Sequence, residues 1–171
     1  MSTIQTETLT EPEMMAYCFG FFDGEGCIQV VKARPKRSYT VCIRAFQKEI
    51  APLLLLKSVF GGVIYTDKIC GIKRIYRWEM RDRKGMHWFL KNGLRYLFCK
   101  KSEAQSALNL LNLTSARGRE FGRWKSVTDL ELSAQKVFYD QCRNAKRVKS
   151  FLLDDDGQSE LRVSYKIDSP K

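Results

Sequence analysis

The first apolar segment of the chain predicts a buried helix. Residues Met14 to Phe22 are apolar nearly all round, which is typical of a helix covered on most sides. The preceding Thr10-Glu11-Pro12-Glu13 is typical of a capping box, with proline tolerated in the first helical turn. Gly24 and Gly26 are expected to end the helix, because glycine is the usual residue after a last helical turn.

Two alternating segments follow, and they predict a hairpin with one apolar and one polar face. The strands are expected over Cys27 to Ala33 and Thr40 to Phe46, joined by the basic loop Arg34-Pro35-Lys36-Arg37-Ser38. Side chains alternate across a strand, so the apolar face would carry Ile28 and Val30 together with Val41, Ile43 and Ala45. The opposite face would be polar.

The rest of the chain predicts another helix and hairpin and then several helices. We expect a helix over Glu49 to Phe60, strands over Val63 to Asp67 and Arg74 to Arg81, and helices over Met86 to Leu97, Ser102 to Leu113 and about Val127 to Ala145. Ser102-Glu103-Ala104-Gln105 is expected to cap the second of these last helices. The order αββαββα predicts an α+β fold, an antiparallel sheet with helices on one face plus C-terminal helices. One domain is expected over 1–145, followed by a charged tail over 146–171.

The net positive charge of the chain is large and unevenly distributed, which limits the kinds of partner that the protein is expected to bind. The 171 residues carry 30 Lys or Arg and 19 Asp or Glu, a net charge of +11. Between Lys32 and Lys101, 18 Lys or Arg stand against four acids. Such a concentrated excess favours a polyanionic partner, either nucleic acid or an acidic membrane surface.

Other features of the composition exclude several classes of protein. The six cysteines form no C-x-x-C pair and His87 is the single histidine, which argues against a zinc site or an iron–sulfur cluster. His87 is expected to pack rather than to catalyse. The N-terminus does not have the pattern of a secretion signal and no apolar run is long enough to span a bilayer. We therefore expect an intracellular protein of the cytoplasm, nucleoid or an organelle, with no membrane partner.

The segment Gly20-Phe21-Phe22-Asp23-Gly24-Glu25-Gly26 offers the clearest candidate chemistry. It places two carboxylates at the end of a buried helix, beside glycines that let a partner chain or a ligand come close. A helix C-terminus is partly negative, so carboxylates there suit a hard divalent cation such as Mg²⁺. Taken alone, such a segment is more often a turn that only ends a helix.

The wider segment Tyr17 to Gly26, Y-C-F-G-F-F-D-G-E-G, resembles the motif of LAGLIDADG homing endonucleases. The order of elements over about residues 10 to 115 is also similar to that family. Cys18 and Phe19 depart from the motif, and we expect Phe19 to point into the core of its own subunit. The resemblance implies a Mg²⁺-dependent endonuclease of introns and other mobile genetic elements that cuts double-stranded DNA at a long pseudo-palindromic site. Because one motif is present, it implies a homodimer whose motif helices pair through Gly20, Phe21 and Gly24.

The same resemblance implies roles for individual residues. Glu25 corresponds to the acid that holds a metal beside the scissile phosphate, and the carbonyl of Gly24 to a further ligand. Asp23 corresponds to a position concerned with the helix end. Gln47 corresponds to a polar residue that orders water, and Lys100 to a basic residue near the active centre, with Lys101 as its rival.

The polar face of the two hairpins is expected to read DNA, because a two-stranded ribbon fits the major groove. Arg44 and Arg77 are expected at guanines, Gln29 at an adenine, and the loop cations at phosphates. The expected DNA-binding residues are Gln29, Val31, Ala33, Arg34, Lys36, Arg37, Ser38, Thr40, Cys42, Arg44, Ile75, Arg77 and Glu79.

Two other functions stay open at the level of sequence. A non-cleaving intron maturase or regulator on the same fold would bind DNA or RNA without cutting it, although the presence of Glu25, Gln47 and Lys100 argues mildly against this. A basic RNA-binding or ribosome-associated α+β protein would prefer RNA to duplex DNA. Cleavage in Mg²⁺ and competition between RNA and DNA separate the three.

Overall fold

A four-stranded antiparallel sheet organises the chain, with strand order β1-β2-β4-β3. Its strands are β1 (Gly26–Ala33), β2 (Ser38–Gln47), β3 (Val63–Lys68) and β4 (Arg74–Met80). The computed structural model describes residues 10–33, 38–68, 74–115, 119–120, 123–124 and 127–154. Within this part, the helices are α1 (Glu11–Glu25), α2 (Ala51–Phe60), α3 (Arg83–Gly93), α4 (Lys101–Ser115) and α5 (Asp129–Asp154).

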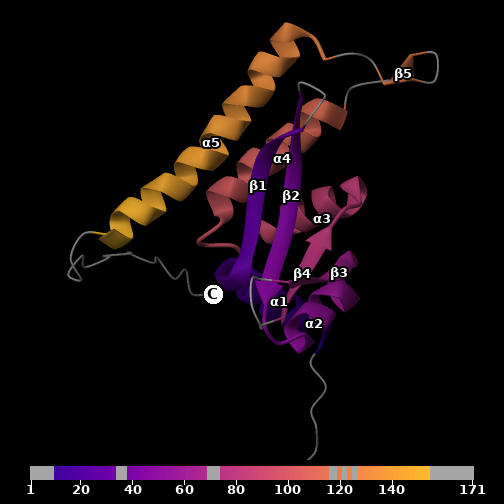
Figure 1. Cartoon of the computed structure of the whole chain (residues 1–171), viewed down its shortest axis with the longest axis vertical. Helices are drawn as coiled ribbons and strands as arrows, with labels where there is room; N and C mark the ends of the chain where they lie inside the picture. The colour runs from indigo at the N-terminus through magenta and orange to yellow at the C-terminus, as the bar shows by residue number, and fades with distance from the viewer. Residues whose placement is uncertain are drawn as a thin grey trace, which may run out of the picture.

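The helices α3 and α4 lie behind the sheet in Figure 1, while β1 and β2 face the viewer. The face toward the helices is buried, because the alternation of each strand sends its apolar side chains there. Ile28, Val30, Val41, Ile43 and Ala45 are all buried, as the sequence predicts. The α+β class and the antiparallel sheet with two different faces are thereby confirmed.

Aromatic rings from α1 form the centre of the core. Phe19 and Phe22 are fully buried, and the Phe19 ring lies 4.8 Å from Phe60, 5.0 Å from Phe89 and 5.2 Å from Tyr96 between centroids. Phe19 therefore points into its own subunit's core, as expected. The Glu13 half of the expected capping box is also in place, because Thr10 donates its backbone N–H and its hydroxyl to the Glu13 carboxylate at 2.8 and 2.7 Å.

A sharp turn joins α2 to β3 at two glycines with positive φ. Gly61 has a φ of 74° and Gly62 one of 87°, in the region that side chains with a Cβ rarely adopt. The indole N–H of Trp78 donates to the Gly61 carbonyl at 2.8 Å, which ties this turn to the neighbouring strand β4. The turn thereby brings β3 back beside β4.

Several predicted helix boundaries are wrong. The helix α3 runs over Arg83–Gly93 instead of Met86 to Leu97, because Asp82 caps it and accepts the Gly85 N–H at 2.6 Å. The helix α4 begins at Lys101, so Ser102 lies inside the first turn and does not cap it. The helix α5 continues to Asp154, well beyond the predicted end at Ala145. A short hairpin, β5 (Arg119–Glu120) with β6 (Arg123–Trp124), was not predicted.

The helix α5 lies along the edge of the sheet. Figure 1 shows it in orange to yellow, running diagonally beside β1. None of the helices in the described part of the chain is both long and apolar enough to cross a membrane.

Candidate active site and DNA-facing surface

The C-terminal end of α1 meets the turn before α4. The Asp23 carboxylate accepts the backbone N–H groups of Phe98, Cys99 and Lys100 at 3.0, 2.9 and 2.9 Å. Three donors occupy the two oxygens of one carboxylate, so Asp23 fixes the course of residues 98–100. This geometry supports a structural role for Asp23 at the helix end.

The side chain of Lys100 returns toward the same helix end. Its ammonium donates to the backbone carbonyl of Asp23 and, at 3.3 Å, to that of Gly24. The last carbonyls of a helix have no partner inside the helix and carry partial negative charge, so an ammonium there is stabilising. Lys101 is the first residue of α4 and is exposed, whereas Lys100 is half-buried. The fold thus brings Lys100, and not Lys101, to the candidate centre.

Glu25 is the last residue of α1 and is exposed, as is Gly24. Gln47 ends β2, two residues beyond the Ala45 that pairs with Gly26, so it lies near the same end of the sheet. The Gln47 side chain accepts the backbone N–H of Lys48 at 2.9 Å. The residues predicted from the sequence to act in catalysis, Glu25, Gln47 and Lys100, therefore lie at one end of the fold. Among them and Gly24, the hydrogen bond from the Lys100 ammonium to the Gly24 carbonyl is a direct contact.

The oxygen donors at this end are of the kind that Mg²⁺ binds. One chain offers the Glu25 carboxylate and the Gly24 carbonyl, and within the described residues no group of three or more His, Cys, Asp or Glu could hold a metal. Mg²⁺ keeps several waters and is usually held by one or two carboxylates together with substrate phosphates. Such an incomplete set suits an ion whose other ligands come from substrate or from a second chain.

One stripe of α1 is exposed although its residues are apolar or small. Tyr17 is 52% exposed, Gly20 and Gly24 are exposed, and Phe21 is only partly buried. A Cβ added at Gly20 or at Gly24 would meet no atom within 4 Å. The packing of this chain therefore gives no reason for glycine at these two positions, which is the pattern expected where another backbone comes close.

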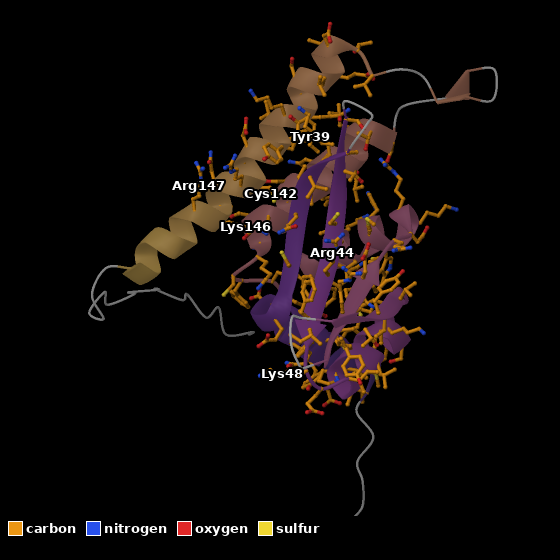
Figure 2. The ribbon with its side chains drawn as sticks, viewed as in Figure 1. Tyr39, Arg44, Lys48, Cys142, Lys146 and Arg147 are labelled. Carbon is orange, nitrogen blue, oxygen red and sulfur yellow. The ribbon has the colours of Figure 1, made fainter. Side chains whose placement is uncertain are left out.

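The outer face of the sheet carries the residues expected to read DNA. Their cross-strand pairs are Gln29 with Cys42, Val31 with Thr40, and Ala33 with Ser38. Arg44 pairs with Glu79 across β2 and β4, and Ile75 of β4 pairs with Asp67 of β3. Figure 2 shows Arg44 over the middle of the sheet and Lys48 at the end of β2. Arg34, Lys36 and Arg37 lie outside the described residues.

Glu79 holds the arginines of this face. Its carboxylate lies 3.5 Å from the Nε of Arg44, 3.6 Å from that of Arg77 and 3.6 Å from that of Arg81. The Glu79 side chain is only 14% exposed, so the cluster is partly screened from water. Glu79 therefore orients cations on this face, a role that the sequence did not reveal.

Tyr65 also belongs to this face. It pairs with Arg77 across β3 and β4, and its ring lies 5.0 Å from the guanidinium of Arg77 and 4.9 Å from that of Arg81. Cations stacked on an aromatic face in this way are held in place. The alternation of β3 in the sequence could have predicted this position of Tyr65, because residues paired across neighbouring strands point to the same face of the sheet.

His87 has the packing role expected for it. Its Nε2 lies 2.9 Å from the Oδ1 of Asn112, which links α3 to α4. This contact joins two helices that lie behind the sheet in Figure 1.

Comparison with known proteins identifies the fold. No protein-family model and no curated protein matches the sequence. The homing endonuclease I-CvuI in complex with the I-CreI target has a TM-score of 0.61 at 18% identity, over 84% of this chain and 94% of that chain. The archaeal intron-encoded homing endonuclease I-Vdi141I, complexed with DNA, has a TM-score of 0.64 at 16% identity, over 80% and 86%.

A longer relative in fold shows the same arrangement in part of its length. The LAGLIDADG homing endonuclease I-GzeII in complex with its DNA target has a TM-score of 0.59 at 16% identity. The match covers 82% of this chain and 49% of I-GzeII, so this chain spans about half of that protein. The resemblance inferred from Tyr17 to Gly26 is thereby confirmed as a likeness of fold.

Proposed function

We propose that this chain, which has the fold of LAGLIDADG homing endonucleases, is a site-specific endonuclease of double-stranded DNA. The observation that carries the proposal is the meeting of Glu25, Gly24 and Lys100 at one helix end, beside a sheet face rich in arginine. Structures with this fold include several in complex with DNA. The chemistry proposed is hydrolysis of one phosphodiester in each strand.

In this proposal, the Glu25 carboxylate and the Gly24 carbonyl would hold a divalent cation such as Mg²⁺. When bound, the cation would supply polarisation of the scissile phosphate and activation of water. Lys100 places a positive charge next to Gly24, where it stabilises negative charge that develops on the phosphate oxygens. Gln47 ends β2, near the residue that pairs with Gly26, and in this proposal it orients a water molecule at the active centre.

The active protein in this proposal is a homodimer. The exposed stripe of Tyr17, Gly20, Phe21 and Gly24 is the surface through which two copies of α1 pair. Small residues let two helix backbones approach closely, and the open space at both glycines supports such an approach. Pairing along this stripe brings two Glu25 carboxylates to the two-fold axis, one for each strand of DNA.

The target in this proposal is a pseudo-palindrome with both cuts near its centre. A two-fold dimer presents the same sheet face twice, and each half reads about one helical turn, or roughly 10 bp. Arg44 and Arg77 are available for guanines in the major groove. Glu79 holds both guanidinium groups in place before DNA arrives, which lowers the entropy that binding would cost.

The test is selection from a randomised duplex library in Mg²⁺, with sequencing of the cut ends. We expect cuts close to the centre of a symmetric site. Glu25→Gln is expected to lower the cleavage rate by about 100-fold or more while DNA binding persists. Glu11→Gln is the matched control, because it removes an exposed carboxylate at the other end of the same helix.

Other outcomes would identify other functions. Binding of duplex DNA without cleavage in Mg²⁺ or Mn²⁺ would indicate a non-cleaving maturase or regulator on this fold. Stronger binding of structured RNA than of duplex DNA would support an RNA-binding protein. An asymmetric site, or cuts far from its centre, would contradict the dimeric arrangement even if cleavage occurred.

A further inference from the structure

The helix α5 is anchored to both strands of the first hairpin, β1 and β2. The Gln135 side chain, which is fully buried, accepts the backbone N–H of Tyr39 at 3.0 Å, and the rings of Tyr139 and Tyr39 lie 5.2 Å apart. Further along, the buried Cys142 thiol lies 3.9 Å from the Ile28 carbonyl. These contacts fix the position of α5 beside β1, which has one strand neighbour only among the described residues.

A groove separates α5 from the outer face of the sheet. It has a volume of about 340 Å³ and is lined by Gln29 and Val31 of β1 and by Cys142, Arg143 and Lys146 of α5, among others. Gln29 and Val31 belong to the face proposed to read bases. Two cations of α5 thus stand directly beside that face.

One end of the groove lies close to the candidate active centre. The Lys146 ammonium lies 3.2 Å from the Cys27 sulfur, and Cys27 follows Glu25 by two residues. This contact fixes the ammonium at the start of β1, although the lysine comes from a distant part of the sequence. Figure 2 shows Lys146 and Arg147 on α5 to the side of the sheet, and Arg44 over its centre.

This part of α5 is strongly basic. The segment from Lys136 to Arg147 contains four cations, Lys136, Arg143, Lys146 and Arg147, against one acid, Asp140. Lys136, Arg143 and Arg147 are exposed, and Lys146 is partly so. In the sequence, the largest excess of positive charge lies between Lys32 and Lys101. The cations of α5 join that basic surface only in the folded protein, because the fold places α5 next to the sheet.

We propose that these four cations, the α5 wall, bind the sugar-phosphate backbone of duplex DNA that lies on the sheet. The inference rests on the proposed function, because it assumes that DNA occupies that face. A ribbon that enters the major groove has one phosphate backbone on each side, since the groove is only about 12 Å wide. The α5 wall lies on one side of the ribbon, where its charge is complementary to a backbone.

The α5 wall sets affinity and register, and it carries no sequence information. Contacts to phosphates are alike for every sequence, whereas contacts from Gln29, Arg44 and Arg77 to base edges are not. Because Lys146 lies against Cys27, two residues after Glu25, the wall also aligns the backbone that leads to the scissile phosphate. Removal of the wall should therefore weaken binding to all duplexes by a similar factor.

The experiment compares two double variants that remove the same charge. Arg143→Gln with Lys146→Gln removes two cations of the α5 wall. Lys84→Gln with Lys91→Gln removes two exposed cations of α3, which lies behind the sheet. Binding to a cognate and to a scrambled duplex is measured by anisotropy in Ca²⁺ over a range of salt concentrations.

We expect the α5 double variant to bind both duplexes more weakly and to have a shallower salt dependence. The slope of log K against log salt should fall by about 0.9 for each phosphate that is no longer neutralised, so by roughly 2 for the two cations together. The α3 double variant should keep the slope of the original protein. Equal slopes for the two double variants, or weaker binding of the cognate duplex alone, would overturn the proposal.

A second variant guards against a folding defect. Arg143→Gln alone changes an exposed residue, and it should lower the slope by about 0.9, while Arg143→Lys should restore it. Full retention of the slope in folded Arg143→Gln counts against the α5 wall. If the original protein binds no duplex DNA, or prefers RNA, the proposed function itself fails, and this outcome is distinct from equal slopes.

Discussion

Asp23 and Lys100 bind each other reciprocally: the Asp23 carboxylate accepts the backbone N–H of Lys100 at 2.9 Å, and the Lys100 ammonium donates to the Asp23 carbonyl. The pair joins residues 77 positions apart in the sequence. It fixes the turn before α4 and, through Gly24, the end of α1. The proposed catalytic lysine is therefore positioned by the Asp23 carboxylate, which also accepts the backbone N–H groups of Phe98 and Cys99.

Asp23→Ala is expected to destabilise the fold. Three backbone N–H groups would be left without their acceptor, and the free energy of unfolding should fall by about 1–2 kcal/mol because these groups are partly exposed. Asp23→Asn keeps one acceptor oxygen and should be less destabilised. Urea unfolding measures both. If Asp23 acts as a metal ligand instead, Asp23→Asn would raise the Mg²⁺ concentration needed for half-maximal cleavage.

Lys100→Met is expected to lower the cleavage rate much more than Lys101→Met. The two variants remove the same charge from adjacent positions, but only Lys100 contacts the Gly24 carbonyl. Single-turnover cleavage of the selected site compares them. Similar decreases in both variants would show that general positive charge matters there, and not the position of one ammonium.

Gly93→Ala is expected to destabilise the core by about 1–3 kcal/mol. A Cβ at Gly93 would lie 2.9 Å from the Phe19 ring and 3.2 Å from Leu97, and the ring is enclosed by other aromatic residues. The double variant Phe19→Leu with Gly93→Ala provides the space that the methyl group needs. Unfolding of the two single variants and the double should show a favourable coupling; strict additivity would mean that Phe19 and Gly93 do not share this space.

Gly20→Leu is expected to convert a dimer to a monomer without unfolding the subunit. A Cβ at Gly20 meets nothing within 4 Å inside the chain, but a leucine there would separate two paired helices. Light scattering after size-exclusion chromatography measures the mass. Asn144→Leu, at an exposed position of α5, is the control and should leave the mass unchanged. A dimer that survives Gly20→Leu would place the interface elsewhere.

Alkaline pH is expected to destabilise the fold partly through Cys18. Burial raises the pKa of the Cys18 thiol from 9.0 to about 11, because the thiolate would lose its solvation. The protonated thiol is favoured in the folded state, so its contribution to stability is fully present below pH 9 and is lost as pH rises toward 11. The free energy of unfolding in urea should fall more steeply across this range for the original protein than for Cys18→Ala. Parallel curves would contradict the assignment.

The sequence by itself determined the elements whose signal is local. The apolar segment from Met14 to Phe22, the alternation around Ile28 and Val41, and Gly61-Gly62 after α2 each follow from periodicity or from backbone preference within a few residues. The same local information indicated the motif from Tyr17 to Gly26. Errors arose at helix ends: α3 begins directly after its cap Asp82, ahead of the expected start at Met86, and α4 begins at Lys101, ahead of the expected cap Ser102.

Only the tertiary structure decided which distant residues meet. The contacts of Asp23 with residues 98–100, of Glu79 with Arg44, and of Lys146 with Cys27 join segments with no common local pattern. Strand register selects the partners on the sheet face, whereas burial of Cys142 and the contact of the Tyr139 ring with Tyr39 select the position of α5. The arrangement of strands and helices is the one that buries the most apolar surface of the whole chain. The apolar surface buried depends on all elements together, so no short segment of the sequence determines which distant residues meet.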